Sequence, residues 1–472
     1  MRSRRDQLQA YQFLARRTTD ALVAGSADPV GPHVARVTRT ALAGTMVGVL
    51  ALAGFGVAGL VSPGSAKGWK RSDTVVIEKD TGARYAWYAG ALHPALNYTS
   101  ARLAVGGQAG TSKVSRASLH GVPRVPSTMG IQDAPDSLPS AKKLTTGPWS
   151  VCTAPVLDVA GRVQQQRRTV VLAGQAPTGT AATEDQGLLV SAGGRDTSLW
   201  VVWAGARHRI ADLRAAAALG LADEPARVVG AAWLDSVPQG ADLVFPALAR
   251  RGAPGPAVAG AATVVGDVVV AQLADGAQYA VVTSSGLALV SPVAAELALS
   301  RSAGARARSI PASALPSVAR SATVPGIDAL PAQRLHPADA SPSHRVVCVV
   351  RRVQASGAGP AVLRLTGSVP AGQPLAAPAG SATPTGDALV MSPGAVAYVR
   401  AEPAAGVSSG TRYLVTDRGL RYPLADDEAV AALGYSSVQP LRVPPLVLGL
   451  IPAGPLLSRA AALTTAGSTT GQ

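Results

Sequence analysis

The sequence predicts an α+β protein: a single transmembrane helix followed by an elongated extracytoplasmic region of four small α/β repeats around a disulfide-linked, β-rich central domain. Three observations lead to this fold class. An uncharged apolar run occupies residues 41–61, a 45-residue segment recurs after 214 residues, and the only two cysteines lie far apart in the chain. Together they predict a membrane anchor, a duplicated module and a cross-link between distant segments.

Residues 1–40 predict a basic amphipathic helix with a linker on the cytoplasmic side of the membrane. The apolar side chains Leu8, Tyr11, Ala15 and Leu22 fall on one helical face. A basic helix of this kind either lies on the lipid surface or docks on a partner in the cytosol. The sequence leaves both interpretations open.

Residues 41–61 predict the transmembrane helix. These 21 residues carry no charge, and as a helix they would extend about 31 Å, which matches the hydrocarbon thickness of a bilayer. Seven arginines precede the run, so the N-terminus is expected in the cytoplasm. A cleaved signal peptide ending near residues 64–66 is the alternative, but the length of the run and of the segment before it favours an uncleaved anchor. Gly44 and Gly48 form a GxxxG that could seat a neighbouring helix, although chance explains the match as well.

Most of the positive charge of the chain lies in the predicted extracytoplasmic region. Residues 1–40 carry a net charge of +4, which leaves +11 of the total +15 for residues 62–472. Such a domain suits anionic cell-wall polymers or acidic partner surfaces, and a mildly basic ectodomain without such a partner is the plainer interpretation. The arginines are isolated and are not interleaved with aromatics, so the pattern argues against nucleic-acid binding.

Cys152 and Cys348 are the only cysteines of the chain. They predict one disulfide if both lie outside the cytoplasm, and two free buried thiols otherwise. The chain contains no CxxC and no Cys/His cluster, so a structural zinc site is not expected.

Internal repetition is the most informative feature beyond the membrane segment. Leu199–Leu243 aligns without a gap with Tyr413–Leu457, and 15 of the 45 positions are identical. In both copies two strand-like runs flank a glycine turn, and an alanine-rich helix follows. Pro-x-Gly marks a further turned or capped element near the end of each copy.

Three residues of the first copy have defined structural roles in this interpretation. Gly205 makes the turn between the strands, Asp212 caps the helix through its side-chain oxygen, and Gly220 takes the left-handed position after the helix. The second copy has Gly419, Asp426 and Gly434 at the corresponding positions.

Two weaker copies, Tyr279–Pro292 and Arg84–Gly106, bring the number of predicted repeats to four. Two stretches between the repeats lack the pattern and contain one cysteine each, so we interpret them as two segments of one central domain. The resulting layout is repeat 1 at residues 62–125, the first central segment at 126–196, repeat 2 at 197–250, repeat 3 at 251–319, the second central segment at 320–400, repeat 4 at 401–460 and a disordered tail at 461–472.

The sequence identifies no catalytic, metal-binding or cofactor-binding residue. It contains no GxxxxGK[ST] phosphate loop, and its nearest approach, Gly64–Lys70, has the wrong spacing. The six histidines are scattered, with no spacing suited to a metal. The acidic run at residues 426–428 is interpreted as a helix start, and Asn97, although in a glycosylation-type Asn-Tyr-Thr, as a cap.

Several motifs in one order give the chain a family resemblance. They are RRDQLQAYQF (Arg4–Phe13), EKDTGARYAW (Glu78–Trp87), LHPALNYTSARL (Leu92–Leu103), PSTMGIQDAPDSLP (Pro126–Pro139), WSVC (Trp149–Cys152) and IPAGPLLS (Ile451–Ser458). On these motifs the chain resembles the EccB family of actinobacterial type VII (ESX) secretion systems over nearly its whole length.

The resemblance implies a single-pass cell-membrane protein with a propeller- or rod-like region of four repeats, and a central disulfide that matches Cys152 and Cys348. It implies assembly with EccC, EccD and EccE-type subunits as an oligomer, in contact with membrane lipids. The expected function is a structural core subunit that anchors and stabilises the export channel from the extracytoplasmic side. An extracytoplasmic ATP hydrolase and a peptidoglycan-binding module are the alternatives. ATP enters only through the family description, because the sequence shows no site for it.

Overall fold

The computed structural model describes residues 4–25, 33–61, 68–70, 74–107, 110–160, 162–194, 196–223, 225–338, 341, 344–376, 385–403, 407 and 409–465. The signal-peptide alternative at residues 64–66 and residues 466–472 of the predicted tail lie outside these ranges. The fold below refers to the described residues.

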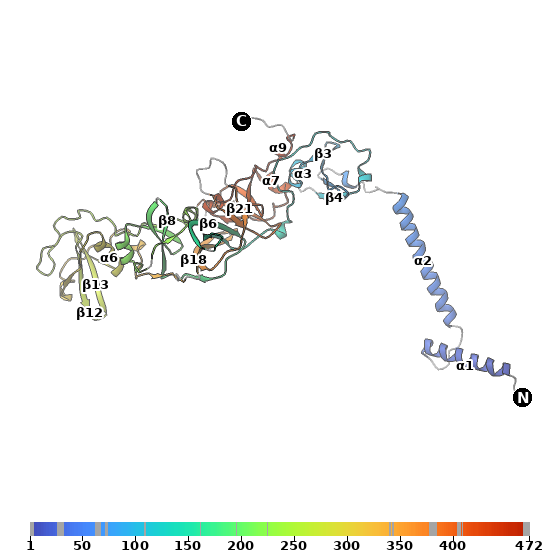
Figure 1. Ribbon diagram of the computed structural model, residues 1–472, viewed down its shortest axis with the longest axis horizontal. Helices are drawn as coiled ribbons and strands as arrows, with labels where there is room; N and C mark the ends of the chain where they lie inside the picture. Colours follow the sequence, from blue (N-terminus) through green and yellow to red (C-terminus); the bar gives the residue numbers. More distant parts are fainter. Residues whose placement is uncertain are drawn as a thin grey trace. The chain divides into compact units, whose positions relative to one another are not determined.

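Two helices form the N-terminal region of the chain. α1 (Arg4–Ala24) exposes the predicted apolar face, including Leu8 and Tyr11. α2 (His33–Val61) is drawn as one continuous helix in Figure 1 and contains a candidate membrane span, Thr38–Val57, of mean hydropathy 1.8. The helix therefore begins eight residues before the uncharged run that predicted it, because the polar residues at its start continue the helical backbone into the flanking region.

Four modules of one design follow in the described residues of the chain. Repeat 1 comprises β1 (Thr74–Glu78), β2 (Arg84–Tyr88), β3 (Ala91–Ala95), α3 (Tyr98–Val105) and β4 (Gly110–Val114). Repeat 2 comprises β8 (Gln186–Gly193), β9 (Asp196–Trp203), β10 (Ala206–Ile210), α4 (Leu213–Ala218) and β11 (Arg227–Val228). Repeat 3 comprises β12 (Val268–Leu273), β13 (Gly276–Thr283), β14 (Gly286–Val290), α6 (Pro292–Ser300) and β15 (Arg308–Ile310). Repeat 4 comprises β21 (Val396–Ala401), β22 (Arg412–Thr416), β23 (Leu420–Leu424), α7 (Asp427–Ala432) and β24 (Leu441–Val443).

Each repeat has the same strand order, third-second-first-fourth. The first three strands form an antiparallel meander, and in repeats 2, 3 and 4 the fourth strand pairs parallel with the first after the helix. A parallel return needs a crossover, which the helix provides. The sequence alignment found the second and third strands and the helix. It missed the first strand because the aligned segments begin at Leu199 and Tyr413, inside the second strand of each repeat.

A closing segment downstream of each repeat covers the edge of its third strand. In repeat 2 the amide of Arg207 donates to Pro238 O (2.8 Å) and the amide of Gly240 to Arg207 O (2.9 Å). The closing segments are residues 124–129, 238–243, 319–321 and 452–457 in repeats 1 to 4. They bridge to the edge strand once in repeats 2 and 3 and twice in repeats 1 and 4. The Pro-x-Gly motifs of the sequence therefore mark sheet edges.

Gly454 should tolerate no side chain. A Cβ at this position would lie 2.6 Å from Cε1 of Tyr422, whose ring is fully buried, so the ring or the closing segment must move. We expect Gly454→Ala to lower the free energy of unfolding by about 1–3 kcal/mol, as overpacked cores do. Urea unfolding of the full chain in detergent measures this loss.

Gly449→Ala is the matched control for this substitution. An added Cβ at Gly449 meets no atom within 4 Å, and the residue lies in the short helix α8 (Pro445–Gly449). Alanine is the better helix former, so the control should be neutral or slightly stabilising. Equal losses for the two variants would contradict the steric argument.

The central domain is a seven-stranded sheet in the order β19-β20-β6-β5-β17-β18-β7. In β5 and β17 all residues of the runs 149–154 and 346–349 are buried, so this part of the sheet is covered on both faces. The strands are β5 (Trp149–Leu157), β6 (Val163–Ala173), β7 (Thr180–Ala181), β17 (Val346–Gln354), β18 (Gly357–Thr366), β19 (Gln373–Pro374) and β20 (Ala388–Val390).

Two short helices connect repeats 2 and 4 to the central sheet. α5 (Ala231–Ser236) and α8 lie 214 residues apart, and they contact each other in one apolar core with β5 and β17. Short connecting elements complete the described chain: β16 (His336–Pro337), α9 (Arg459–Ala462), and 3₁₀ turns at Gly68–Lys70, Arg116–Leu119, Ala141–Lys143, Ala312–Ala314 and Ile327–Ala329.

The two faces of each repeat sheet have different neighbours. Repeats 2 and 3 share a core through α4 and α6, to which Leu189 of repeat 2 and Val268 of repeat 3 contribute. The opposite face of repeat 2 packs on the central sheet, whereas that of repeat 3 is covered by Val258 from the hairpin in front of β12. Repeat 2 packs this sheet face on the central domain, and repeat 3 buries the equivalent face under its own hairpin.

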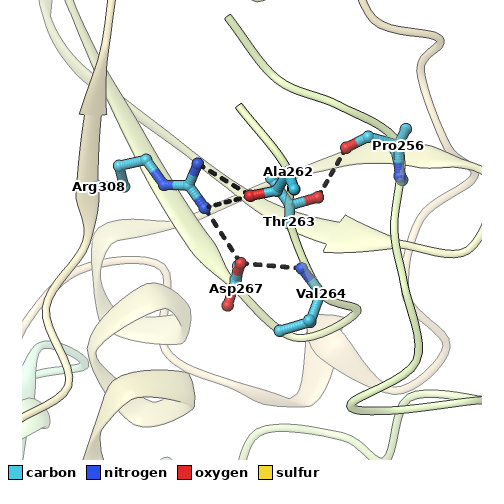
Figure 2. A network of polar contacts seen from close by, with 6 residues as sticks. All are labelled: Pro256, Ala262, Thr263, Val264, Asp267 and Arg308. Carbon is cyan, nitrogen blue, oxygen red and sulfur yellow. Dashed lines mark hydrogen bonds and ion pairs between the residues drawn. The ribbon is translucent and has the colours of Figure 1, made fainter. Parts of the chain in front are cut away.

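A small polar network holds that hairpin, as Figure 2 shows. The Arg308 guanidinium contacts Asp267 (3.3 Å) and donates to the carbonyl of Ala262 (3.3 Å), while the Val264 amide donates to Asp267 (3.0 Å). The Thr263 hydroxyl donates to Pro256 O (2.6 Å).

The structure moves three of the expected boundaries. β8, which lies in the predicted first central segment, pairs in the sheet of repeat 2, and β21 begins repeat 4 inside the predicted second central segment. Residues 461–465 of the predicted disordered tail carry the end of α9 and a bridge from Thr465 to Met129. They are ordered because repeat 1 offers them backbone partners, which composition cannot reveal.

Candidate functional site

The centre of the fold is a covalent link between the two segments of the central domain. Cys152 on β5 and Cys348 on β17 stand opposite each other in the antiparallel register and form the disulfide. Both are fully buried, next to Val170 and Ala388. The link joins positions 196 residues apart, so repeats 2 and 3 are enclosed in a covalent loop.

Trp233 fixes the same sheet to repeat 2. It is fully buried on α5, and its indole Nε1 donates to Val151 O of β5 at 2.9 Å. The adjacent Gly230 amide donates to the hydroxyl of Thr153 on that strand at 2.9 Å. An apolar side chain and two hydrogen bonds therefore hold α5 at one position along β5.

Glu402 connects repeat 4 to the central domain. Its carboxylate is buried, accepts the amide of Ala358 on β18 (3.0 Å), and lies 3.5 Å from the guanidinium of Arg442 on β24. Burial lowers the pKa of the nearby Arg351, and the charge of Glu402 opposes that shift. A buried carboxylate is stable only with such partners, so Glu402 restricts how the two domains meet. Sequence reasoning missed this residue, because it lies in no repeated motif.

The first and last repeats contact each other through their helices. In Figure 1 α3, α7 and α9 lie together, and Arg102 of α3 donates from Nε to the carbonyl of Ala432 on α7 at 2.8 Å. The Tyr422 hydroxyl donates to Asp133 O (3.0 Å) and the Tyr435 hydroxyl to Pro139 O (2.8 Å). Burial raises the pKa of both phenols, so they stay neutral donors.

The predicted helix caps and turns are found within repeats 2 and 4. The side chain of Asp212 accepts the Ala215 amide (3.0 Å), and Gly220 follows the helix at φ +85°. A Cβ on Gly205 would lie 2.4 Å from Ala361 O of β18, so this turn also approaches the central sheet. In repeat 4, Asp426 caps α7, Gly434 has φ +86°, and Gly419 turns at φ +80° next to Leu375.

The remaining candidates have structural surroundings. Asp427 pairs with Arg412, and Glu428 pairs with Arg459 at 3.0 Å. Asn97 is buried and caps α3 through the Ser100 amide at 2.8 Å, as the sequence suggested. Among the described residues, no three His, Cys, Asp or Glu side chains gather in a metal-binding group.

The predicted helix-packing pair lies on α2. An added Cβ on Gly44 or Gly48 would meet no atom of the described residues within 4 Å, so among these residues this face of α2 is open for a second helix. The GxxxG contact therefore stays a prediction.

His93 predicts a pH dependence of stability. Its ring stacks on Tyr88 with centroids 3.7 Å apart, and its Nε2 is buried without a hydrogen-bond partner among the residues that the structure describes. Burial lowers the pKa of His93 from the ordinary value. The unfolded chain, with an ordinary histidine pKa near 6.5, therefore binds this proton more readily than the folded chain. This contribution to stability is complete above about pH 6.5 and is lost as the pH falls below that value.

Replacing His93 with glutamine measures this contribution. Urea unfolding between pH 5.5 and 7.5 should give a shallower pH slope for His93→Gln than for the natural chain. Identical slopes would show that the imidazole has no role in the pH dependence.

These features define the class of protein. It is a candidate single-span membrane protein whose duplicated α/β modules pack around a disulfide-linked sheet. The family model for "Type VII secretion system ESX-1, transport TM domain B" matches residues 2–470. The chain belongs to this family, and the resemblance drawn from its motifs is confirmed.

Curated relatives and solved structures agree with that assignment. The ESX-3 secretion system ATPase EccB3 of Mycolicibacterium smegmatis is 30% identical over 97% of this chain and 90% of its own length. The ESX-2 secretion system ATPase EccB2 of Mycobacterium tuberculosis is 30% identical over 98% of this chain and 94% of its own. A chain of an intact ESX-5 inner membrane complex matches with a TM-score of 0.68 at 25% identity, covering 100% of this chain and 97% of that one. A chain of the EccB3 dimer from the ESX-3 core complex matches with a TM-score of 0.65 at 28% identity, covering 83% and 100%.

Proposed function

We propose that this chain is a structural core subunit of a type VII secretion membrane complex, which anchors and stabilises the export channel from the extracytoplasmic side. The observation that carries the proposal is the match of the whole chain to a component of an intact ESX-5 inner membrane complex. The fold supports a mechanical role, because the disulfide, Trp233 and Glu402 fix the repeats to one central sheet.

The orientation and the partners belong to the proposal. The arginines before α2 favour a cytoplasmic α1 and place the repeats outside. Partners of the EccC, EccD and EccE type would then contact α1 and α2 from the cytoplasm and the membrane, and further copies of this chain would oligomerise with it. The open glycine face of α2 is available for such a helix contact.

Affinity purification from solubilised membranes tests this function. A tagged full-length chain should co-purify with an FtsK/SpoIIIE-like ATPase and with other membrane subunits in one high-mass complex. Protease added to protoplasts should digest the repeats and spare α1. Purification of the chain alone as a monomer would refute the proposal, and protection of the repeats would refute the orientation.

ATP hydrolysis is the second candidate function, because the relatives above are named ATPases. The sequence contains no phosphate-binding loop of the Walker type. We therefore expect hydrolysis in the complex to come from a partner subunit. Purified full-length chain should release no phosphate from magnesium-ATP above the level of a mock preparation. Release that scales with the amount of this chain through two purification steps would favour the enzyme.

A further inference from the structure

Each repeat sheet ends at an edge strand that its closing segment covers only partially. The first covered residues are Leu92, Arg207, Leu287 and Arg421 in repeats 1 to 4, and repeats 1 and 4 have a second bridge at Ala95 and Leu424. Backbone groups of successive strand residues point alternately to the two sides of the strand. The residue two positions further along the edge therefore also directs its N–H and C=O outward.

Three of the four repeats protect this second position. In repeats 1 and 4 it is Pro94 and Pro423, which have no N–H, and their carbonyls accept the amides of Met129 (2.9 Å) and Leu457 (2.8 Å). In repeat 2 it is Arg209, whose carbonyl accepts the Leu243 amide (2.9 Å). Proline and charged side chains are the usual means by which proteins prevent pairing at a sheet edge.

Repeat 3 has neither protection at this position. The register pairs Leu287 with Val282 and Leu289 with Ala280, and Leu287 bonds outward to Ala319 O and to the Ser321 amide. Leu289 therefore also faces outward, and neither its amide nor its carbonyl has a backbone partner on that side within the described chain. Its apolar side chain is 37% exposed.

An open hollow lies beside this free edge. After Ser321 the closing segment turns away from the edge of β14, and residues 323–332 line the hollow together with that strand. The hollow has a volume of about 430 Å³. Asp328 is the charged residue of its lining. Leu289 and Ser291 line one side of the hollow, and Thr323, Ile327 and Leu330 lie with Asp328 in the rest of its lining.

We propose that the uncovered edge of β14 at Leu289 binds an extended segment of another protein of the secretion complex by strand addition. An apolar residue of that segment lies against Leu289, and a basic residue lies near Asp328. The sister repeats indicate this chemistry, because a methionine or leucine in an extended segment occupies the same register in repeats 1 and 4. Main-chain hydrogen bonds give such contacts their affinity, and side-chain pockets their specificity. The inference rests on the proposed function, since the partner is a member of that complex.

Amide hydrogen exchange of the full-length chain tests the proposal, free in detergent and within the purified complex. The amides of Leu289 and Ser291 should exchange at least tenfold more slowly in the complex. Equal exchange in a complex that contains the chain would overturn this inference and leave the proposed function intact. A chain that never enters a complex would instead refute the proposed function. Protection that rises with the concentration of the free chain would identify a second copy as the occupant and overturn the assignment to another protein.

Two substitutions copied from the sister repeats separate binding from folding. Leu289→Pro and Leu289→Arg introduce the residues found at this register in repeats 4 and 2, so the sheet should keep its thermal midpoint. Leu289→Pro removes the amide from which the added segment would accept a hydrogen bond, and Leu289→Arg replaces the apolar contact with a positive charge near the basic residue expected in that segment. Both should therefore speed the exchange of Ser291 in the complex toward the rate of the free chain. Leu213→Arg, at a side chain 61% exposed in repeat 2, is the control and should leave the protection unchanged. Full protection of Ser291 in both Leu289 variants would overturn the proposal.

Discussion

Replacing Cys152 and Cys348 together with alanine is expected to lower the free energy of unfolding by about 5 kcal/mol. The disulfide closes a loop with a sequence separation of 196 residues, and the chain-entropy model gives about that value for a loop of this length. Both sites are fully buried in an apolar cluster, so alanine introduces no unpaired polar group. Urea unfolding of the full-length protein in detergent, followed by tryptophan fluorescence, measures the change.

Reduction of the natural protein provides an independent check. Dithiothreitol should shift the unfolding midpoint of the natural chain toward that of the double variant and leave the double variant unchanged. A double variant within about 1 kcal/mol of the natural chain would show that native contacts already restrict the unfolded ensemble or offset the link.

Replacing Trp233 with alanine is expected to cost about 3–5 kcal/mol, the range for deleting a buried tryptophan. The side chain is fully buried in the shared core of the central sheet and α5, and the substitution also removes the donor to Val151 O. Since α5 attaches repeat 2 to the central sheet, we expect protease sensitivity to rise around residues 227–237. Urea unfolding and limited proteolysis of the full chain measure the two effects.

Two further variants separate the contributions of apolar burial, the hydrogen bond and the position on α5 to this loss of stability. Trp233→Phe keeps most of the apolar volume and loses the hydrogen bond, so it should cost clearly less than alanine. Trp203→Ala, at a half-buried tryptophan of the same repeat, should also cost less. Equal losses for Trp233→Ala and Trp203→Ala would mean that burial on α5 does not determine the stability of this junction.

The membrane helix, the core of the repeats and the two-segment central domain could be predicted from the sequence. The uncharged run predicted the membrane helix, and the 214-residue offset predicted the strand-turn-strand-helix core of the repeats, since its glycines and caps mark backbone geometry directly. Asp212 and Asp426 indeed cap α4 and α7. The two cysteines indicated a central domain made of two separate segments, and they form the disulfide.

What could not be predicted depends on contacts between distant segments. The first strand of each repeat has an apolar pattern that fits any buried strand, so only its pairing assigns β8 to repeat 2. Glu402 and Arg102 owe their roles to partners in other domains, at Ala358 and Ala432. The sequence shows a proline in the third strand of repeats 1 and 4 and none in β14. Only the register of the strands shows that this position faces the edge of the sheet.

The contact between α3 and α7 has a consequence for biosynthesis. Arg102 and its acceptor on residue 432 are 330 positions apart. Repeat 1 is therefore synthesised first, but its contact with α7 can form only after nearly all of the later modules have been synthesised. If the repeats are exported as proposed, this interval passes in the extracytoplasmic space, where the exposed side of the first module would need a chaperone or fast translocation to avoid aggregation.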